Sequence, residues 1–243
     1  MEFLGQAVAW LADPAHWHGR DGIPIRLVEH LQLSGVSVAI AAALALPAGV
    51  VAGHTGRGGF AVINLANVGR ALPSIAILSL ALVLTIRHVG LGFWPTVIAL
   101  VFLAVPPIVS NTYVGIREVD RDLVEAARGL GMRERQIIWR AEIPLALPVI
   151  LVGLRTASVQ VIATATLGAI VASGGLGRYL IDGIATSDDA RVFIGAFLVA
   201  SLAVATELVY GALERALRYR ERSSARKAAP AREPLQAARP GGI

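Results

Sequence analysis

Long uncharged runs alternate with short polar segments along this chain. Residues 31–53 and 89–116 contain no Asp, Glu, Lys or Arg. Three further runs contain a single charged residue each, at 58–86, 143–177 and 192–213. Because about 20 apolar helical residues cross the hydrocarbon core of a bilayer, this pattern predicts an all-α integral membrane protein with about five transmembrane helices.

Composition agrees with this prediction. Of the 243 residues, 55% are hydrophobic and only 16% are charged. The absence of cysteine excludes disulfides and thiolate metal sites. Residues 1–29 do not resemble a cleaved signal peptide, because they lack a basic start and their apolar stretch ends early, at Asp13-Pro14. We expect an extracytoplasmic or interfacial leader there, followed by a transmembrane domain at 30–215.

The basic residues are distributed unevenly. Fifteen of them lie at Arg57, in the loop at 117–142 and from Arg215 to the end, whereas the loops predicted on the opposite side hold five. The positive-inside rule then places the amino terminus outside and the carboxyl terminus in the cytoplasm. This arrangement is typical of a membrane protein and argues against nucleic-acid binding. Residues 216–243, rich in Arg, Ala and Pro, are predicted to be a disordered cytoplasmic tail.

The loop at 117–142 is longer than a simple connection requires. Its apolar side chains recur at helical spacing, and acidic side chains near the start favour a helix amino terminus. Gly131 is expected to end this helix, and residues 132–139 can form a second short helix. Periodicity alone leaves open an ordinary amphipathic surface helix. The residues that carry the pattern are Asp122, Leu123, Val124, Glu125, Ala127 and Leu130.

The spacing of Glu125-Ala126-Ala127, Gly131 and Ile143-Pro144 resembles the cytoplasmic signature of ABC importer permeases. The resemblance implies a type I importer permease fold, with a coupling helix between transmembrane helices 3 and 4 that docks on a separate ATPase subunit. Ala141 and Ile143 depart from the family's usual larger aliphatic residue and leucine. The coupling residues that it implies are Glu125, Ala126, Ala127, Gly129, Gly131 and Pro144.

Four further stretches resemble the branch that imports osmoprotectants such as glycine betaine, choline, carnitine and proline betaine. They are ALPSIAIL (71–78), NTYVGI (111–116), PLALPVILVGLRTA (144–157) and SGGLG (173–177). Methionine-type amino-acid permeases share much of this scaffold and stay an alternative. The resemblance implies a bacterial cell membrane, two ATPase subunits, a second permease chain and an extracytoplasmic substrate-binding protein.

The chain shows no pattern of an enzyme. It lacks the Gly-x4-Gly-Lys-Ser/Thr loop that holds nucleotide phosphates. We therefore expect no catalytic residue, metal or cofactor here, with ATP and magnesium bound by the partner subunit. A self-sufficient secondary transporter would show internal repeats, which we do not find. A membrane anchor without transport would leave the loop at 117–142 unexplained.

Two charges at membrane depth are candidates for an ion pair. Arg155 and Glu207 lie in separate predicted spans, at depths that differ by only about 5 Å at the helical rise of about 1.5 Å per residue. The alternative is that each side chain finds backbone or water partners. Residues 60–69 are expected to lie along the interface, before the helix break at Pro73. Candidates for the passage and its gate are Arg70, Pro73, Ser74, Asn111, Thr164 and Thr166, with ordinary helix packing as their alternative role.

Overall fold

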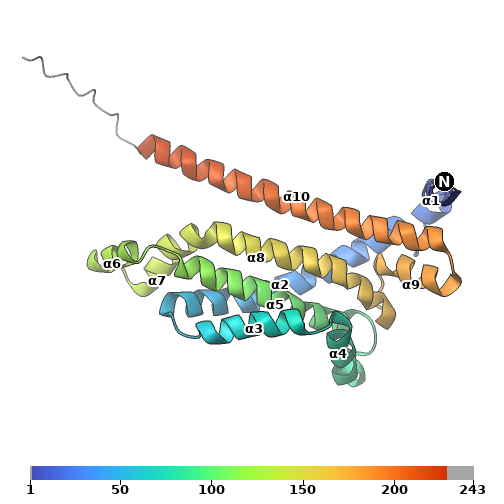
Figure 1. The fold of residues 1–243 in the computed structure, drawn as a ribbon, viewed down its shortest axis with the longest axis horizontal. Helices are drawn as coiled ribbons and strands as arrows, with labels where there is room; N and C mark the ends of the chain where they lie inside the picture. The colour runs from blue at the N-terminus through green and yellow to red at the C-terminus, as the bar shows by residue number, and fades with distance from the viewer. Residues whose placement is uncertain (1, 229–243) are drawn as a thin grey trace, which may run out of the picture.

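The computed structural model describes residues 2–228, and these form an elongated bundle of helices (Figure 1). Three short elements have other helical geometries: η1 and η3 are 3₁₀ helices, and η2 is a π-helix. The bounds are α1 (Glu2–Ala12), η1 (Pro14–Trp17), α2 (Ile23–Thr55), α3 (Gly59–Ala71), α4 (Ser74–Val89), α5 (Phe93–Arg117), α6 (Arg121–Gly129), α7 (Glu134–Ile137), η2 (Ile138–Glu142), α8 (Ile143–Thr164), η3 (Ala165–Val171), α9 (Gly177–Thr186) and α10 (Asp189–Ala228).

Four segments of the described chain are long and apolar enough to cross a membrane. They are α2, α5, the run at 134–171 and α10 as far as residue 217, with mean hydropathies of 2.1, 2.0, 1.8 and 2.2. The bent pair α3 and α4 provides a fifth crossing if the two helices act as one span. The prediction of an all-α, multi-pass membrane protein with about five spans is confirmed.

The second predicted span is broken, and its first half does not lie where we expected it. Helices α3 and α4 meet at an angle of 98°. The break falls at Leu72-Pro73, where Leu72 is extended and Pro73 has no N–H to donate. Instead of lying along the interface, α3 packs beside α5, with Val62 in the central core. The close approach of Gly69 to Pro106 fixes this packing.

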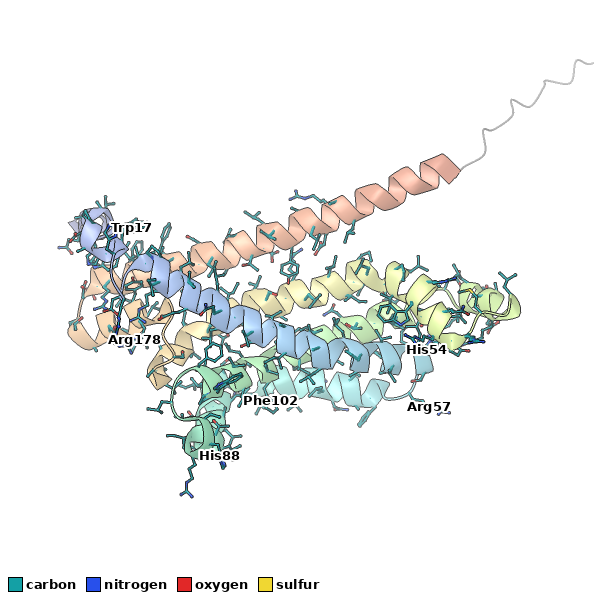
Figure 2. All side chains as sticks on the ribbon, turned by 180° about the vertical axis from the view of Figure 1, so that it is seen from behind. Trp17, His54, Arg57, His88, Phe102 and Arg178 are labelled. Carbon is teal, nitrogen blue, oxygen red and sulfur yellow. The ribbon has the colours of Figure 1, made fainter. Side chains whose placement is uncertain are left out.

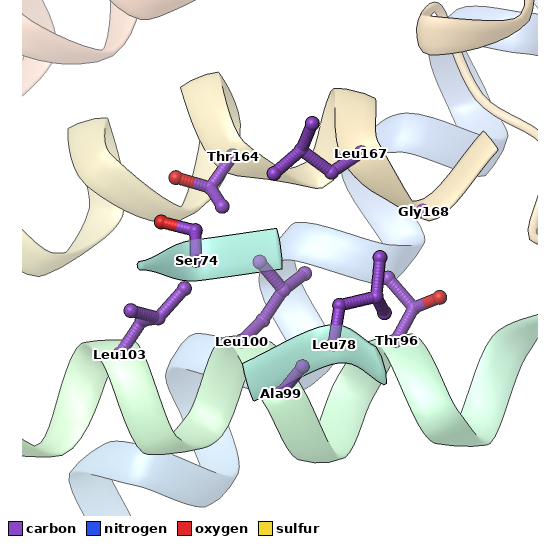
Figure 3. Close-up of a pocket in the computed structure, with 9 residues that line it drawn as sticks. All are labelled: Ser74, Leu78, Thr96, Ala99, Leu100, Leu103, Thr164, Leu167 and Gly168. Carbon is purple, nitrogen blue, oxygen red and sulfur yellow. The ribbon is translucent and has the colours of Figure 1, made fainter. Parts of the chain in front are cut away.

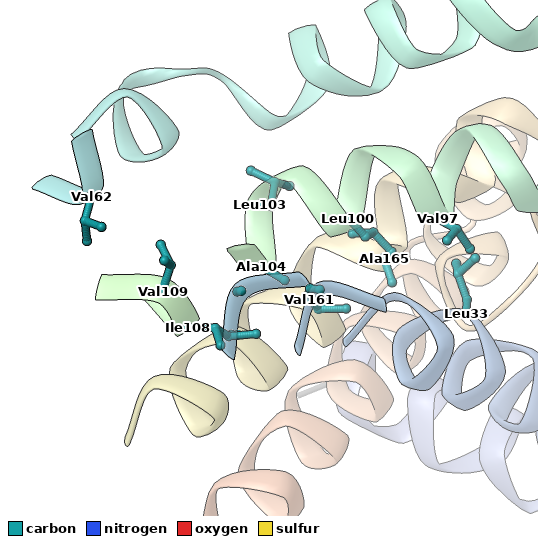
Figure 4. Packing of buried hydrophobic residues seen from close by; sticks show 13 residues of the cluster. Leu33, Val62, Val97, Leu100, Leu103, Ala104, Ile108, Val109, Val161 and Ala165 are labelled. Atoms are coloured by element: carbon teal, nitrogen blue, oxygen red, sulfur yellow. The ribbon is translucent and has the colours of Figure 1, made fainter. Parts of the chain in front are cut away.

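The centre of the bundle is formed by α2, α5 and α8. A seam of small residues on α2, at every fourth position, faces α5 and comprises Ala41, Ala45, Gly49 and Gly53. A Cβ atom added to Gly49 would lie 2.6 Å from Cβ of Thr112. Small residues allow helices to approach closely where no hydrophobic effect drives them together. Around this seam, larger side chains such as Leu33, Leu100, Ile108 and Val161 fill the core (Figure 4).

Seven hydroxyl side chains in the apolar helices are satisfied within their own helix. Each donates its proton to the carbonyl oxygen four residues earlier, at distances from 2.6 to 2.9 Å. Such bonds remove the cost of an unpaired donor in an apolar environment. The residues are Ser37, Ser79, Thr85, Thr96, Thr112, Thr156 and Thr206.

The leader is attached to the bundle. Trp10 and Leu11 pack against a cluster that includes Tyr179 and Val199, and the Tyr179 hydroxyl donates to the backbone oxygen of Asp21 at 2.6 Å. Burial raises the pKa of Tyr179 to about 12. The leader is thus placed on α9 and α10, at the end of the molecule opposite α6 and α7 (Figure 1).

The predicted tail at 216–243 overlaps the end of α10. Helix α10 continues to Ala228, and the disorder of the tail stays a prediction. Alanine, arginine and glutamate are all good helix formers, and they extend a helix that has already started. The rest of the predicted tail, residues 229–243, lies outside the described residues.

Candidate functional site

The loop at 117–142 folds as the predicted pair of short helices. Asp120 caps the start of α6, because its Oδ1 accepts from the N–H of Asp122 at 2.9 Å. Gly131 ends the turn with a φ of +80°, a conformation that glycine adopts readily. The N–H of Met132 then donates to the oxygen of Ala127 at 3.1 Å, which closes the helix end before α7 starts.

The two faces of α6 differ. Val124 and Ala127 are buried against a cluster that includes Ile116 and Ile137. Ala127 lies three residues after Val124 and on the same inward face, and its coupling role stays a prediction. The side chain of Leu130, at the end of α6, is 85% exposed. The other proposed coupling residues are exposed as well, and they are Glu125, Ala126, Gly129, Gly131 and Pro144.

The exposed face of this element leaves free space for a partner. Among the described residues, no atom lies within 4 Å of a Cβ atom added at Gly129 or Gly131. Leu123 and Trp139 are 42% and 64% exposed. Apolar side chains next to unobstructed glycines favour contact with another protein surface. We call α6, α7 and the turn between them, residues 121–137, the coupling loop.

A polar network joins the coupling loop to the end of α2, and it was not predicted from the sequence. Nδ1 of His54 lies 2.7 Å from Oε2 of Glu142, and Nε2 lies 3.1 Å from Oε2 of Glu134. Glu134 also accepts two hydrogen bonds from Arg128, at 2.9 and 3.1 Å. The only signal in the sequence is the position of His54 and Glu142 at the ends of apolar runs, 88 residues apart.

Glu142 is the unusual member of this network. Its side chain is completely buried, and Oε1 has no hydrogen-bond partner within the described part of the chain. The two carboxylates contact opposite nitrogens of His54, and residues 2–228 contain no group of three side chains that could bind a metal ion. Through His54 the network connects α2 with α7 and with η2.

Arg155 and Glu207 form an ion pair between α8 and α10. Arg155 also lies 3.3 Å from Glu214, two turns further along α10. Between the two carboxylates, the hydroxyls of Ser158 and Tyr210 are 3.0 Å apart. Glu214 was missed because it follows the apolar run at 192–213.

Charge reversal tests this connection. Arg155→Glu would place three carboxylates together at membrane depth, so we expect a loss of most monodisperse protein after extraction, measured by size-exclusion chromatography. The double variant Arg155→Glu/Glu207→Arg restores one opposite-charge pair and should recover a large part of the yield. Arg20→Glu, an exposed site in the leader, is the matched control. A double variant no better than Arg155→Glu would contradict a role for this pair.

Two of the predicted gate residues meet in the structure. Ser74 and Thr164 line a cavity of about 10 Å³ together with Thr96, which was not among the predicted gate residues (Figure 3). This volume holds about one water molecule, and leucines close it on several sides. The leucines are Leu78, Leu100, Leu103 and Leu167.

The other gate candidates lie elsewhere. Asn111 donates to the oxygen of Pro107 in its own helix at 2.8 Å and packs closely on Gly153. Thr166 is half-buried and donates to the oxygen of Ala163 at 2.8 Å. Pro73 precedes Ser74 at the start of α4. Arg70 lies in α3; its side chain is outside the described set.

Comparison with known proteins agrees with this architecture. Residues 45–219 match the family described as binding-protein-dependent transport system inner membrane component. The choline transport system permease protein OpuBB of Bacillus subtilis is 36% identical over 78% of this chain and 85% of its own length. The glycine betaine/carnitine/choline transport system permease protein OpuCB of the same organism is 37% identical, over 77% and 84%.

A solved structure shows the same fold. A chain in inward-facing conformations of the MetNI methionine ABC transporter superposes with a TM-score of 0.73 at 23% identity, covering 85% of this chain and 99% of that one. At 23% identity this structure shows the fold alone. The family is shown by the family match and by the relatives at 36% and 37% identity. This chain therefore belongs to the family of binding-protein-dependent transport system inner membrane components.

Proposed function

We propose that this chain is the permease subunit of an ATP-driven importer that passes osmoprotectants into the cytoplasm of a bacterium. The solute class is that of glycine betaine, choline, carnitine and proline betaine. It is supported by relatives at 36% and 37% identity whose names state choline, glycine betaine and carnitine transport. The chain carries no chemistry of its own in this proposal, and ATP and magnesium bind to a separate cytoplasmic ATPase.

The complete importer would contain two permease chains, identical or homologous, two ATPase subunits and one extracytoplasmic substrate-binding protein. In the cell membrane, the end that carries the coupling loop would face the cytoplasm. Figure 2 supports this orientation, because Arg57 lies beside His54 at that end and Trp17 and Arg178 lie at the other. The positive-inside rule favours the Arg-rich end as the cytoplasmic one.

The observation that carries the proposal is the exposed, glycine-ended coupling loop. It is anchored by Val124 and Ile137, which are buried, and it presents Leu130 and two unobstructed glycines outward. ATP-driven closure of the ATPase subunits would push on this element. The transmembrane helices would then move as rigid bodies between inward-open and outward-open arrangements.

The binding step is tested by co-purification with the ATPase encoded beside this chain. Gly131→Asp is expected to reduce the recovered ATPase by about tenfold or more, equivalent to about 1.4 kcal/mol of binding free energy. Aspartate tolerates a positive φ better than most residues, so the loss would come from charge and bulk at the surface. Gly5→Asp places the same side chain in free space at the opposite end and should bind normally. Absence of an ATPase from the wild-type preparation would overturn the proposal.

The solute is tested separately, by uptake into proteoliposomes that contain the complete importer. We expect ATP-dependent accumulation of radiolabelled glycine betaine or choline, with methionine as the comparison solute. Preference for methionine would favour the amino-acid importer, the second candidate, which shares the fold. Uptake without ATP and driven by an ion gradient would indicate a secondary transporter.

A further inference from the structure

We infer that His54 is a positioning residue that fastens α2 to the coupling loop, and that α2 carries the loop's displacement to the outer loop at residues 172–176. The inference rests on the proposed function, since it assumes that an ATPase moves the coupling loop. The binding of an ATPase does not by itself explain why His54 contacts both Glu134 and Glu142, or why the outer loop packs on α2.

The inner attachment is made through Glu134. This residue belongs to α7 and contacts Nε2 of His54 at 3.1 Å, while Arg128 of α6 holds the same carboxylate with two hydrogen bonds. Both short helices of the coupling loop therefore make polar contact with α2 through one side chain, in addition to the apolar packing of Leu46 and Val50 of α2 on the cluster that contains Val124 and Ile137. The loop is covalently continuous with α8 through η2, whereas α2 has no such continuity and depends on noncovalent contacts.

His54 has a second contact that serves as an anchor. Its Nδ1 bonds to Glu142 at 2.7 Å, in the wide π-helical turn that leads into α8. Because Glu142 is buried, this contact holds α2 and α8 together at the inner end. The imidazole of His54 thus makes two contacts. Nδ1 binds the anchor, Glu142, and Nε2 binds Glu134 of the coupling loop.

The outer end of α2 is held in a similar way. Oε2 of Glu29 accepts from the N–H of Gly175 at 2.8 Å, and the buried His30 bonds to the backbone oxygen of Ile162 in α8 at 2.9 Å. A Cβ atom at Gly174 would lie 2.6 Å from Glu29, so the outer loop rests directly on the first turns of α2. Movement of these turns must displace the loop.

Between the two ends, α2 is a continuous helix of 33 residues, about 50 Å long at the usual rise per residue. Pro47 removes one backbone hydrogen bond within this helix. The small residues on either side of it, Ala45 and Gly49, are packed in the seam against α5, which limits bending at this point. A shift at His54 is therefore transmitted along the axis to Glu29. The structure in this way joins the coupling loop and the outer loop by a packed element with polar attachments at both ends.

Two substitutions remove the contact between His54 and Glu134 and keep the bond to Glu142. The amide nitrogen of asparagine takes the place of Nδ1, so His54→Asn keeps the bond to Glu142 and loses the contact with Glu134. Glu134→Ala removes the same contact from the other side, at a side chain that is 54% exposed. The matched control is His88→Asn, an exposed histidine at the end of α4.

The experiment uses the complete permease–ATPase complex and compares hydrogen exchange at residues 172–176 with and without trapping by ATP and vanadate. In the wild type and in His88→Asn, trapping should change the exchange rate of this loop. In His54→Asn and in Glu134→Ala, we expect the change to shrink about fivefold or more, the lower limit of usual coupling between sites. The double variant should be no worse than either single variant, since both remove one link.

Co-purification of the ATPase is measured in the same preparations. If ATPase binds and both variants show the wild-type exchange change, the inference is overturned and the proposed function stands. If the wild type recovers no ATPase, the proposed function itself fails. Should His54→Asn not assemble, Glu134→Ala decides alone, because it leaves the His54–Glu142 bond in place.

Discussion

Leucine in place of His54 is expected to lower the free energy of unfolding by about 1–3 kcal/mol, the usual cost of leaving a buried polar group without its hydrogen-bond partner. The reason is Glu142, whose side chain is fully buried and bonds only through Oε2, to His54. Without the imidazole, this carboxyl group would have no partner within the described residues. The measurement is the midpoint of thermal loss of monodisperse protein in detergent.

The double variant His54→Leu/Glu142→Leu is the control for this prediction. Replacing both partners by apolar groups of similar volume can be close to neutral, so most of the lost stability should return. The exposed His88→Leu should leave the midpoint within a degree or two, as surface substitutions usually do. A single His54→Leu variant with wild-type stability would show that Glu142 has another partner.

Gly49→Leu is expected to have an effect at least as large, for a different reason. Its Cβ would already lie 2.6 Å from Cβ of Thr112, so a leucine must push α2 and α5 apart over several turns. Overpacking of a close interface costs about 3 kcal/mol or more in severe cases. We expect loss of monodisperse protein, measured by the same thermal assay.

Gly35→Leu provides the comparison on the same helix. Among the described residues, nothing lies within 4 Å of a Cβ atom at Gly35, so leucine can be accommodated there and also favours the helix. Equal destabilisation by the two substitutions would mean that helix propensity or insertion, and not the contact between α2 and α5, determines the effect.

The features that could be predicted from the sequence depend on local patterns. Uncharged runs of sufficient length predict spans, because a bilayer requires them wherever they occur. The ends of α6 were predictable since Asp122 and Gly131 act within one turn of the chain. Arg155 and Glu207 could be paired because a charge at membrane depth has few alternatives.

The features that were missed depend on packing between distant segments. The network of His54 and Glu142 joins residues 88 positions apart, and no periodicity marks it. The inward direction of Ala127 follows from the helix phase, yet its neighbours only become known once Ile137 packs there. At Pro73 a break was predictable, but its angle of 98° is set by the fit of α3 against α5.

The hydroxyl groups of the apolar helices have an electrostatic consequence. A serine or threonine hydroxyl has one proton and two lone pairs. In Thr96 and Thr206 the proton is donated to the carbonyl four residues earlier, so the oxygen has only lone pairs left to offer. Along these helices, side chains that look amphoteric in the sequence therefore present negative potential. Where such oxygens face a passage, they would favour a methylated ammonium group, and they have no proton to donate to an anion.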